Sequence, residues 1–264
     1  WSALNSLAQA PVGERTLTGL AMLIASNPLK QALLPYTLDG AFGQCLDADE
    51  ESFDFSQVMC FETEDLMPEP NLLIPVLTYL FHRLERRFDG RPTLLVLDEA
   101  WVFLDNPLFS ARIREWLKTL RKKNVSVVFA TQSLADVIDS PIAPAIIESC
   151  PQRILLPNER ALEPQMREAY TRMGLNARQI EVIARALPKR QYYLQSRRGN
   201  RLFDLALGPI ALAICGASAT DEQRLIDRLL HDFGAAWFPH AFVTARAPAW
   251  AKDLLLDFDN PPAA

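Results

Sequence analysis

Two adjacent carboxylates, Asp98 and Glu99, directly follow an apolar run at residues 94–97. A buried parallel strand delivers its last residues to the carboxyl edge of the sheet, where ligands bind in open α/β folds. One carboxylate at that edge can hold Mg²⁺, directly or through a water, and a second can orient and deprotonate an attacking water. The pair therefore predicts a site for metal-assisted hydrolysis of a nucleotide.

An apolar strand that ends in Asp-Glu is the Walker B pattern of P-loop ATPases. The alternative interpretation is that Asp98 caps the following turn and Glu99 is solvated, because short apolar runs before acidic residues are common.

A second strand ends in polar residues that suit the same site. The sequence "VVFATQS" places Thr131 and Gln132 at the end of an apolar run, and we expect both beside the nucleotide on the same sheet edge. A neutral amide can hydrogen-bond a γ-phosphate or the attacking water without changing the charge of the site. The alternative is a glutamine that caps a loop.

The elements around these residues predict an α/β domain with a mainly parallel sheet. Strand, helix and strand alternate from residue 93 to residue 157, the order typical of a parallel sheet. The expected strands are 93–97, 125–131 and 152–157, with a helix at 106–124 that Asn106 caps and a helix extended by 145–149. Further expected elements are helices within 1–38, 70–88, 161–173, 177–186 and 219–234, two short strands in 52–66, a hairpin at 190–207 and a last strand at 210–216. We expect the main domain to cover 1–216, and a C-terminal helix and tail to cover 217–264.

Composition excludes several classes of protein. The 264 residues are 49% hydrophobic and 22% charged, with a formal net charge of −5, so the chain is not a free-standing basic nucleic-acid binder. Four scattered cysteines and three scattered histidines form no zinc or disulfide pattern, which favours a reduced compartment. No apolar run is long enough to span a membrane. Because the first residue is Trp1, we expect the sequence to be part of a longer protein.

Several segments in a fixed order closely resemble the conjugal-transfer ATPase family of type IV secretion systems (TrbE-like, the largest of the VirB ATPases). The resemblance runs from "RTLTGL" to about Ser218, through "FETEDLM", "GRPTLLVLDEAWVFLDNPLFSARIREWLKTLRKKNVSVVFATQSLADVIDSPIA", "IIESCPQRILLPN", "MGLNARQIEVIA" and "RRGNRLFDLALGPIALAICGAS". It implies a RecA-like P-loop motor that uses ATP and Mg²⁺ and assembles as a homo-hexamer. It also implies a place at the cytoplasmic face of the bacterial inner membrane, with other inner-membrane components of the secretion system as partners.

The resemblance assigns roles to individual residues. Asp98 and Glu99 match the Walker B acids, with Asp98 holding Mg²⁺ through a water and Glu99 as the catalytic carboxylate, and Gln132 matches the glutamine motif that follows. Arg121, in "LRKKN", occupies the place of an arginine that reaches the nucleotide of a neighbouring subunit, which would make hydrolysis depend on assembly. A solvated helix end is the alternative for Arg121. Weaker candidates for phosphate contact are Arg153, Arg197 and Arg198.

The phosphate-binding loop of the family is missing from the sequence. G-x-x-x-x-G-K-[ST] occurs nowhere in the 264 residues, so the chain resembles the C-terminal part of the motor without its N-terminal Walker A part. Without that loop we expect weak or no ATP binding by this piece alone.

Two other functions stay open. One is a DNA-translocating coupling protein, whose DNA channel the basic face Arg112, Arg114, Lys118, Arg121 and Lys122 could line. The other is a non-catalytic scaffold subunit. The helix at 219–234 and the aromatic residues Trp237, Phe238 and Trp250 could dock on their own sheet or contact a neighbouring subunit.

Overall fold

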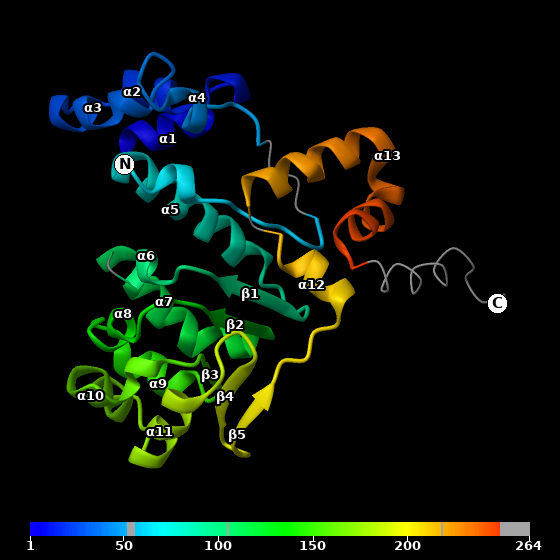
Figure 1. Cartoon of the computed structure of the whole chain (residues 1–264). Coiled ribbons are helices and arrows are strands. Elements are labelled where there is room, and N and C mark those ends of the chain that lie inside the picture. Colours follow the sequence, from blue (N-terminus) through cyan, green and yellow to red (C-terminus); the bar gives the residue numbers. More distant parts are fainter. Residues whose placement is uncertain (52–55, 105, 218, 249–264) are drawn as a thin grey trace. The chain divides into compact units, whose positions relative to one another are not determined.

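The computed structural model describes residues 1–51, 56–104, 106–217 and 219–248, and leaves out the side chains of 101, 102 and 237–240. The chain forms two compact units, Trp1–Ala130 and Thr131–Ala264, each described below by itself. Figure 1 shows both, coloured along the sequence. The domain boundary expected after residue 216 stays a prediction.

Short helices form the start of the first unit, as the sequence predicts for residues 1–38. They are α1 (Ser2–Gln9), α2 (Leu17–Leu23), α3 (Asn27–Leu33) and α4 (Gly43–Leu46), with 3-10 turns at Val12–Glu14 and Leu34–Tyr36. The buried Asp47 ties them together, because its carboxylate accepts hydrogen bonds from the backbone N–H groups of Leu17, Thr18 and Leu38. A carboxylate that satisfies several orphan N–H groups at a helix start compensates for its own burial.

The core of the first unit lies between α5 (Pro70–Arg87), α6 (Trp101–Leu104) and α7 (Pro107–Thr119). Phe81 of α5 lies at its centre, with ring centroids 5.6 Å from Phe103, 5.3 Å from Phe109 and 4.7 Å from Trp116. Such aromatic pairs add roughly 0.5–1.5 kcal/mol each beyond their buried area. The predicted cap is confirmed, because the Asn106 side chain accepts the Leu108 N–H at 2.9 Å.

The two strands predicted around the carboxylates are confirmed. β1 (Thr93–Leu97) and β2 (Val125–Phe129) pair in parallel, with Thr93 opposite Val125 and Leu97 opposite Phe129. The expectation that β1 is a buried strand holds for one face only. Leu95 and Leu97 are buried, whereas Leu94 is 65% exposed and Val96 is 55% exposed. The strand pair therefore has one covered face among the residues that the structure describes.

The prediction of two strands in 52–66 is wrong for its described part. Residues 56–63 form no strand, and Glu64–Leu66 is a 3-10 turn (η3), while 52–55 lie outside the described residues. The alternation of apolar residues in "SFDFSQVMCF" favours strands, but a strand also needs a neighbour for its backbone hydrogen bonds. In the described part of the chain no sheet includes Val58, which is 86% exposed.

The second unit combines a three-stranded antiparallel sheet with helices. The helices before its β-hairpin are α8 (Leu134–Ile138), α9 (Ala143–Ser149), α10 (Pro164–Arg172) and α11 (Ala177–Arg185), with the 3-10 turn η5 (Glu159–Leu162). The sheet contains β3 (Arg153–Leu155), β4 (Gln191–Ser196) and β5 (Gly199–Asp204), the last two forming the predicted hairpin. The expectation that the third strand extends the parallel sheet is wrong, because β3 pairs antiparallel with β4, with Leu155 opposite Tyr193.

The last strand predicted at 210–216 is also wrong, because this segment is the helix α12 (Pro209–Cys215). Periodicity alone cannot distinguish a short apolar strand from a buried helix turn. Pro209 at the first helical position favours the helix, and Ile210 packs on the buried Val243 and Ala247. Those two belong to the end of the unit, where α13 (Thr220–Arg246) is longer than predicted and kinks at Gly234, whose φ is 68°.

The aromatic tail lies almost entirely outside the described part of the chain. Trp250 belongs to 249–264, which the structure does not describe, and the side chains of Trp237 and Phe238 are left out as well. Their predicted contacts stay predictions.

Candidate functional site

The two carboxylates lie in a turn that is pinned to the ends of β1 and β2. The Ala130 N–H donates to the Leu97 carbonyl at 2.9 Å, and the Ala130 carbonyl accepts the Ala100 N–H at 2.9 Å. Between these two bonds the Glu99 N–H donates to Asp98 Oδ1 at 3.0 Å. The backbone before and after Asp98 and Glu99 is thus fixed to one residue at the carboxyl end of β2.

Glu99 has a left-handed backbone, with φ at 49°. A residue with a Cβ pays about 1–2 kcal/mol for this conformation, which glycine or asparagine adopts more easily. Such strain persists only where surrounding bonds over-determine the backbone, and it is concentrated at functional sites. The glutamate is therefore held at this position in spite of its backbone preference, as expected for a residue needed for its carboxylate.

The donor set suits an Mg²⁺ held mainly by water and phosphate oxygens. Asp98 is exposed and Glu99 is half-buried. Asp98 uses Oδ1 for the Glu99 N–H, and its second oxygen, Oδ2, can accept a hydrogen bond from a metal-bound water. Among the described residues, no group of three or more His, Cys, Asp or Glu side chains could hold a metal by itself. Mg²⁺ commonly binds through one or two carboxylates plus substrate phosphates, so Asp98 fits this role.

Thr131 and Gln132 open the second unit, while the two carboxylates belong to the first. Gln132 is exposed. Thr131 donates its hydroxyl hydrogen to Asp136 Oδ2 at 3.0 Å, and Ser133 caps α8 by accepting the Ala135 N–H. Asp136 did not stand out in the sequence. The spacing of Ser133 and Asp136, which matches the S-x-x-D pattern at a helix start, is the signal that could have found it.

Within the first unit, Arg121 lies at the amino-terminal end of the parallel strands β1 and β2, whereas the carboxylates lie at their carboxyl end. It belongs to the 3-10 turn η4 (Leu120–Lys123), which directly precedes β2, whereas Asp98 follows β1. Because β1 and β2 are parallel, the start of β2 and the end of β1 are separated by the strand length, roughly 16 Å for five residues. Arg121 therefore cannot serve the carboxylate turn of its own strand pair.

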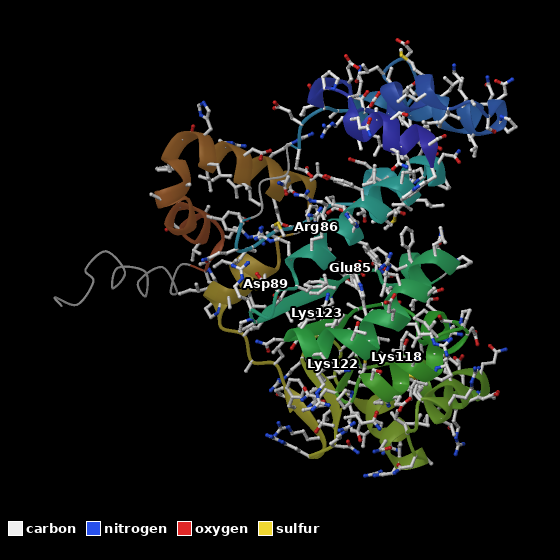
Figure 2. All side chains as sticks on the ribbon, turned by 180° about the vertical axis from the view of Figure 1, so that it is seen from behind. Glu85, Arg86, Asp89, Lys118, Lys122 and Lys123 are labelled. Carbon is white, nitrogen blue, oxygen red and sulfur yellow. The ribbon has the colours of Figure 1, made fainter. Side chains whose placement is uncertain are left out.

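Arg121 belongs to a basic cluster along the chain, with the exposed Lys118, Lys122 and Lys123. Figure 2 labels these three lysines together with Glu85 and Asp89. Both acidic side chains are already paired: Glu85 with Arg112 at 3.0 Å, and Asp89 with Arg91 at 2.9 Å. Because Arg112 pairs with Glu85, it does not add a free positive charge to the basic face that the sequence predicts.

The weaker arginine candidates separate into two kinds. The Arg153 guanidinium donates to the carbonyls of Met173 and Ile147, both at 2.7 Å, and to Gln195 Oε1 at 3.1 Å. These bonds give Arg153 a structural role in the second unit. Arg197 and Arg198 lie exposed in the turn between β4 and β5.

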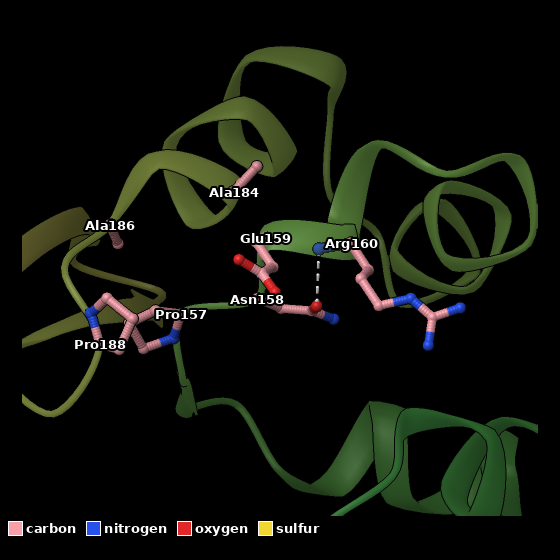
Figure 3. A pocket seen from close by; sticks show the side chains of 7 residues that line it. All are labelled: Pro157, Asn158, Glu159, Arg160, Ala184, Ala186 and Pro188. Carbon is pink, nitrogen blue, oxygen red and sulfur yellow. Dashed lines mark hydrogen bonds between the residues drawn. The ribbon is translucent and has the colours of Figure 1, made fainter.

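A pocket in the second unit is lined by Pro157, Asn158, Glu159, Arg160, Ala184, Ala186 and Pro188 (Figure 3). Asn158 shapes one wall, because its side chain accepts the Arg160 N–H at 3.0 Å and donates to the Tyr170 hydroxyl at 3.2 Å. Arg160 in turn pairs with Glu163 at 2.9 Å. The polar groups of this wall thus bond to one another, which is the pattern of a structural turn.

The parallel strands β1 and β2, joined through α6 and α7 and with two carboxylates directly after β1, define an α/β domain. Residues 24–193 match the TraG P-loop domain, and the chain belongs to this family. The structure of VirB4 of Thermoanaerobacter pseudethanolicus has the same fold, with a TM-score of 0.60 at 19% identity over 79% of this chain and 62% of that chain.

The chain is also similar to a conjugal transfer protein and to a type IV secretion system protein. The chain is 49% identical to conjugal transfer protein TrbE of Rhizobium radiobacter, over 91% of this chain and 29% of that protein. It is 30% identical to type IV secretion system protein virB4 of Bartonella quintana, over 90% of this chain and 31% of that protein. The chain thus spans about a third of the length of these relatives. In the part of the chain that the structure describes, no helix is long and apolar enough to cross a membrane.

Proposed function

We propose that this chain is the C-terminal part of an ATP-hydrolysing motor that powers type IV secretion and conjugal transfer. The observation that carries the proposal is the carboxylate turn at the end of β1, in which Glu99 keeps a strained left-handed backbone. Membership of the TraG P-loop domain family supports nucleotide chemistry, and the similarity to TrbE and virB4 supports the biological setting.

The residues divide the work of phosphoryl transfer. Asp98 would hold a water of the Mg²⁺ that accompanies ATP, and the chemistry that this metal would supply is neutralisation of charge on the phosphates. Glu99 orients the attacking water and accepts its proton. Gln132 hydrogen-bonds the γ-phosphate or the water as a neutral donor.

Arg121 completes the site of a neighbouring subunit in this proposal. Arg121 lies at the end of the parallel strands away from the carboxylates, which supports action on a neighbouring subunit. In a closed ring, one side of each subunit faces the site of the next subunit. A cation that arrives with the neighbour stabilises charge on the transferred phosphoryl group. The motor is then a homo-hexamer, active only when assembled, at the cytoplasmic face of the bacterial inner membrane beside other secretion components.

Mg-ATP turnover by the full natural protein tests the proposal. The measurement compares wild type with Glu99→Gln. We expect turnover to fall by about two orders of magnitude or more while ATP binding is retained, because the amide keeps the shape but cannot accept a proton. Unchanged turnover would remove Glu99 from the mechanism. The absence of turnover from both proteins would favour a scaffold subunit. The 264 residues alone, which lack the phosphate loop, should bind ATP no better than weakly, and micromolar binding would contradict this expectation.

A DNA-translocating motor is the second candidate, and the basic cluster around Arg121 favours it. A steep fall of DNA affinity with salt would support it, since each neutralised phosphate releases counterions. The net charge of −5 and the pairing of Arg112 with Glu85 weigh against it.

A further inference from the structure

The loop that carries Gln132 is held by side-chain hydrogen bonds on both sides of this residue. Before it, the Thr131 hydroxyl donates to Asp136 Oδ2 at 3.0 Å. After it, the Ser133 hydroxyl accepts the Ala135 N–H at 3.1 Å. The residues next to Gln132 are thus tied to the first turn of α8, while Gln132 itself is exposed.

The helix that supplies Asp136 is itself anchored. Val137 and Ile138 of α8 are buried. Arg172, the last residue of α10, donates to the Ile138 carbonyl at 3.0 Å and pairs with Asp139 at 3.2 Å. α8 and α10 contact each other within the second unit and lie side by side in Figure 1. Asp136 therefore projects from an element whose core face and C-terminal end are both held.

The partner that Asp136 takes is unusual for its position. It is the third residue of α8 after the cap Ser133, the place from which an acidic side chain ordinarily accepts the cap residue's own N–H. The carboxylate accepts the Thr131 hydroxyl instead, and so spans Gln132. A cap needs no such bond, because Ser133 already satisfies a backbone donor of the helix start.

We propose that Thr131 and Asp136 form a loop clamp that positions Gln132 for its contact with the γ-phosphate or the attacking water. The proposal rests on the function proposed above. Phosphate oxygens accept hydrogen bonds, and the Thr131 hydroxyl hydrogen is given to Asp136, so Thr131 acts as a positioning residue and not as a nucleotide ligand. Fixing the loop before substrate arrives saves ordering entropy, and misplacement by about 1 Å can cost a hundredfold in rate.

Four variants of the full natural protein test the clamp. Thr131→Val removes the hydroxyl with nearly the same shape, and Asp136→Ala removes the acceptor. Thr131→Ser and Asp136→Asn are the matched controls, because they keep a donor and an acceptor for the same bond. We expect the first two to lower kcat roughly tenfold or more with KM unchanged, and the two controls to stay near wild type.

Two further measurements separate positioning from general stability. In a Gln132→Ala background, Asp136→Ala should cause little further loss of kcat, because residues that act through one group are not additive. Hydrogen exchange of the segment around residues 130–137 should become faster in Thr131→Val and Asp136→Ala, and stay at the wild-type rate in the controls.

The possible results of these measurements have different meanings for the clamp. The clamp is refuted if Asp136→Ala is as harmful without Gln132 as with it, or if Tm falls while kcat and exchange do not change. A raised KM for Thr131→Val, independent of Gln132, would show that Thr131 contacts the nucleotide directly. If wild type does not turn over ATP, the proposed function and the catalytic role of the clamp both fail, whereas a failure confined to the clamp leaves the Glu99→Gln result intact.

Discussion

Glu99, the proposed catalytic carboxylate, has an unfavourable backbone conformation. Its φ of 49° would suit glycine, and the bonds from Ala130 to Leu97 and Ala100 hold the turn in place. A structural turn at this point would have little reason to keep a side chain that costs about 1–2 kcal/mol. At the scale of the residue, chemistry and stability therefore make opposite demands.

Glu99→Gly tests this conflict. We expect the free energy of unfolding of Glu99→Gly to be up to about 1 kcal/mol higher than that of Glu99→Ala. Both variants lack the carboxylate, but only glycine relieves the left-handed strain, and its greater freedom in the unfolded chain offsets part of that gain. Turnover should be lost in both, as in Glu99→Gln. Denaturant unfolding measures the difference, and a Glu99→Gly variant that is less stable than Glu99→Ala would show that the backbone is not strained there.

At the scale of elements, one side chain joins α5 to the helix that leads to Arg121. Glu85 of α5 accepts two hydrogen bonds from Arg112 and one from the Trp116 indole N–H, both on α7. Trp116 is 3% exposed, so its N–H depends on this partner. Because Trp116 also stacks on Phe81, the polar brace and the aromatic core hold the same pair of helices.

Glu85→Ala should therefore lower the free energy of unfolding by about 2–3 kcal/mol, because it leaves a buried N–H without an acceptor and Arg112 without its charge partner. Glu115→Ala, at an exposed position of α7, is the control and should change stability by less than about 0.5 kcal/mol. Thermal or denaturant unfolding of the natural protein measures both. Equal effects of the two substitutions would rule out the brace.

At the scale of the whole assembly, the geometry of the strand pair predicts that catalysis needs two subunits. Arg121 and the carboxylate turn lie at opposite ends of the parallel strands β1 and β2. In the proposed ring, each site would combine Glu99 of one subunit with Arg121 of the next.

Mixed rings test this prediction. Glu99→Gln and Arg121→Ala should each be inactive alone, whereas co-expression in equal amounts should restore activity at roughly a quarter of the interfaces, where an intact Glu99 meets an intact Arg121. ATP turnover of doubly tagged, purified assemblies is the measurement. Lys122→Ala, the neighbouring exposed cation, is the control and should keep most of the activity. No recovery in the mixed assemblies would place both residues in the same subunit's site, or Arg121 in none.

Local sequence patterns determined much of this protein. The apolar run in 93–97 predicted β1, Asn106 predicted the start of α7, and the segment 190–207 predicted the β4–β5 hairpin. Each depends on neighbouring residues alone, through caps, turn residues and hydrophobic period. The candidate site likewise follows from the adjacency of Asp98 and Glu99 along the chain.

Only the tertiary structure decided the features that depend on distant partners. β3 turned out antiparallel because β4, far along the chain, supplies its hydrogen bonds, and α12 formed where a strand was expected because Ile210 packs on residues near the end of α13. The left-handed backbone of Glu99 arises from bonds to Ala130, which no pattern in "LVLDEA" encodes. The opposite placement of Arg121 and Asp98 follows from the parallel pairing of β1 and β2, since a sequence states only what is adjacent along the chain and pairing determines which edge each residue reaches.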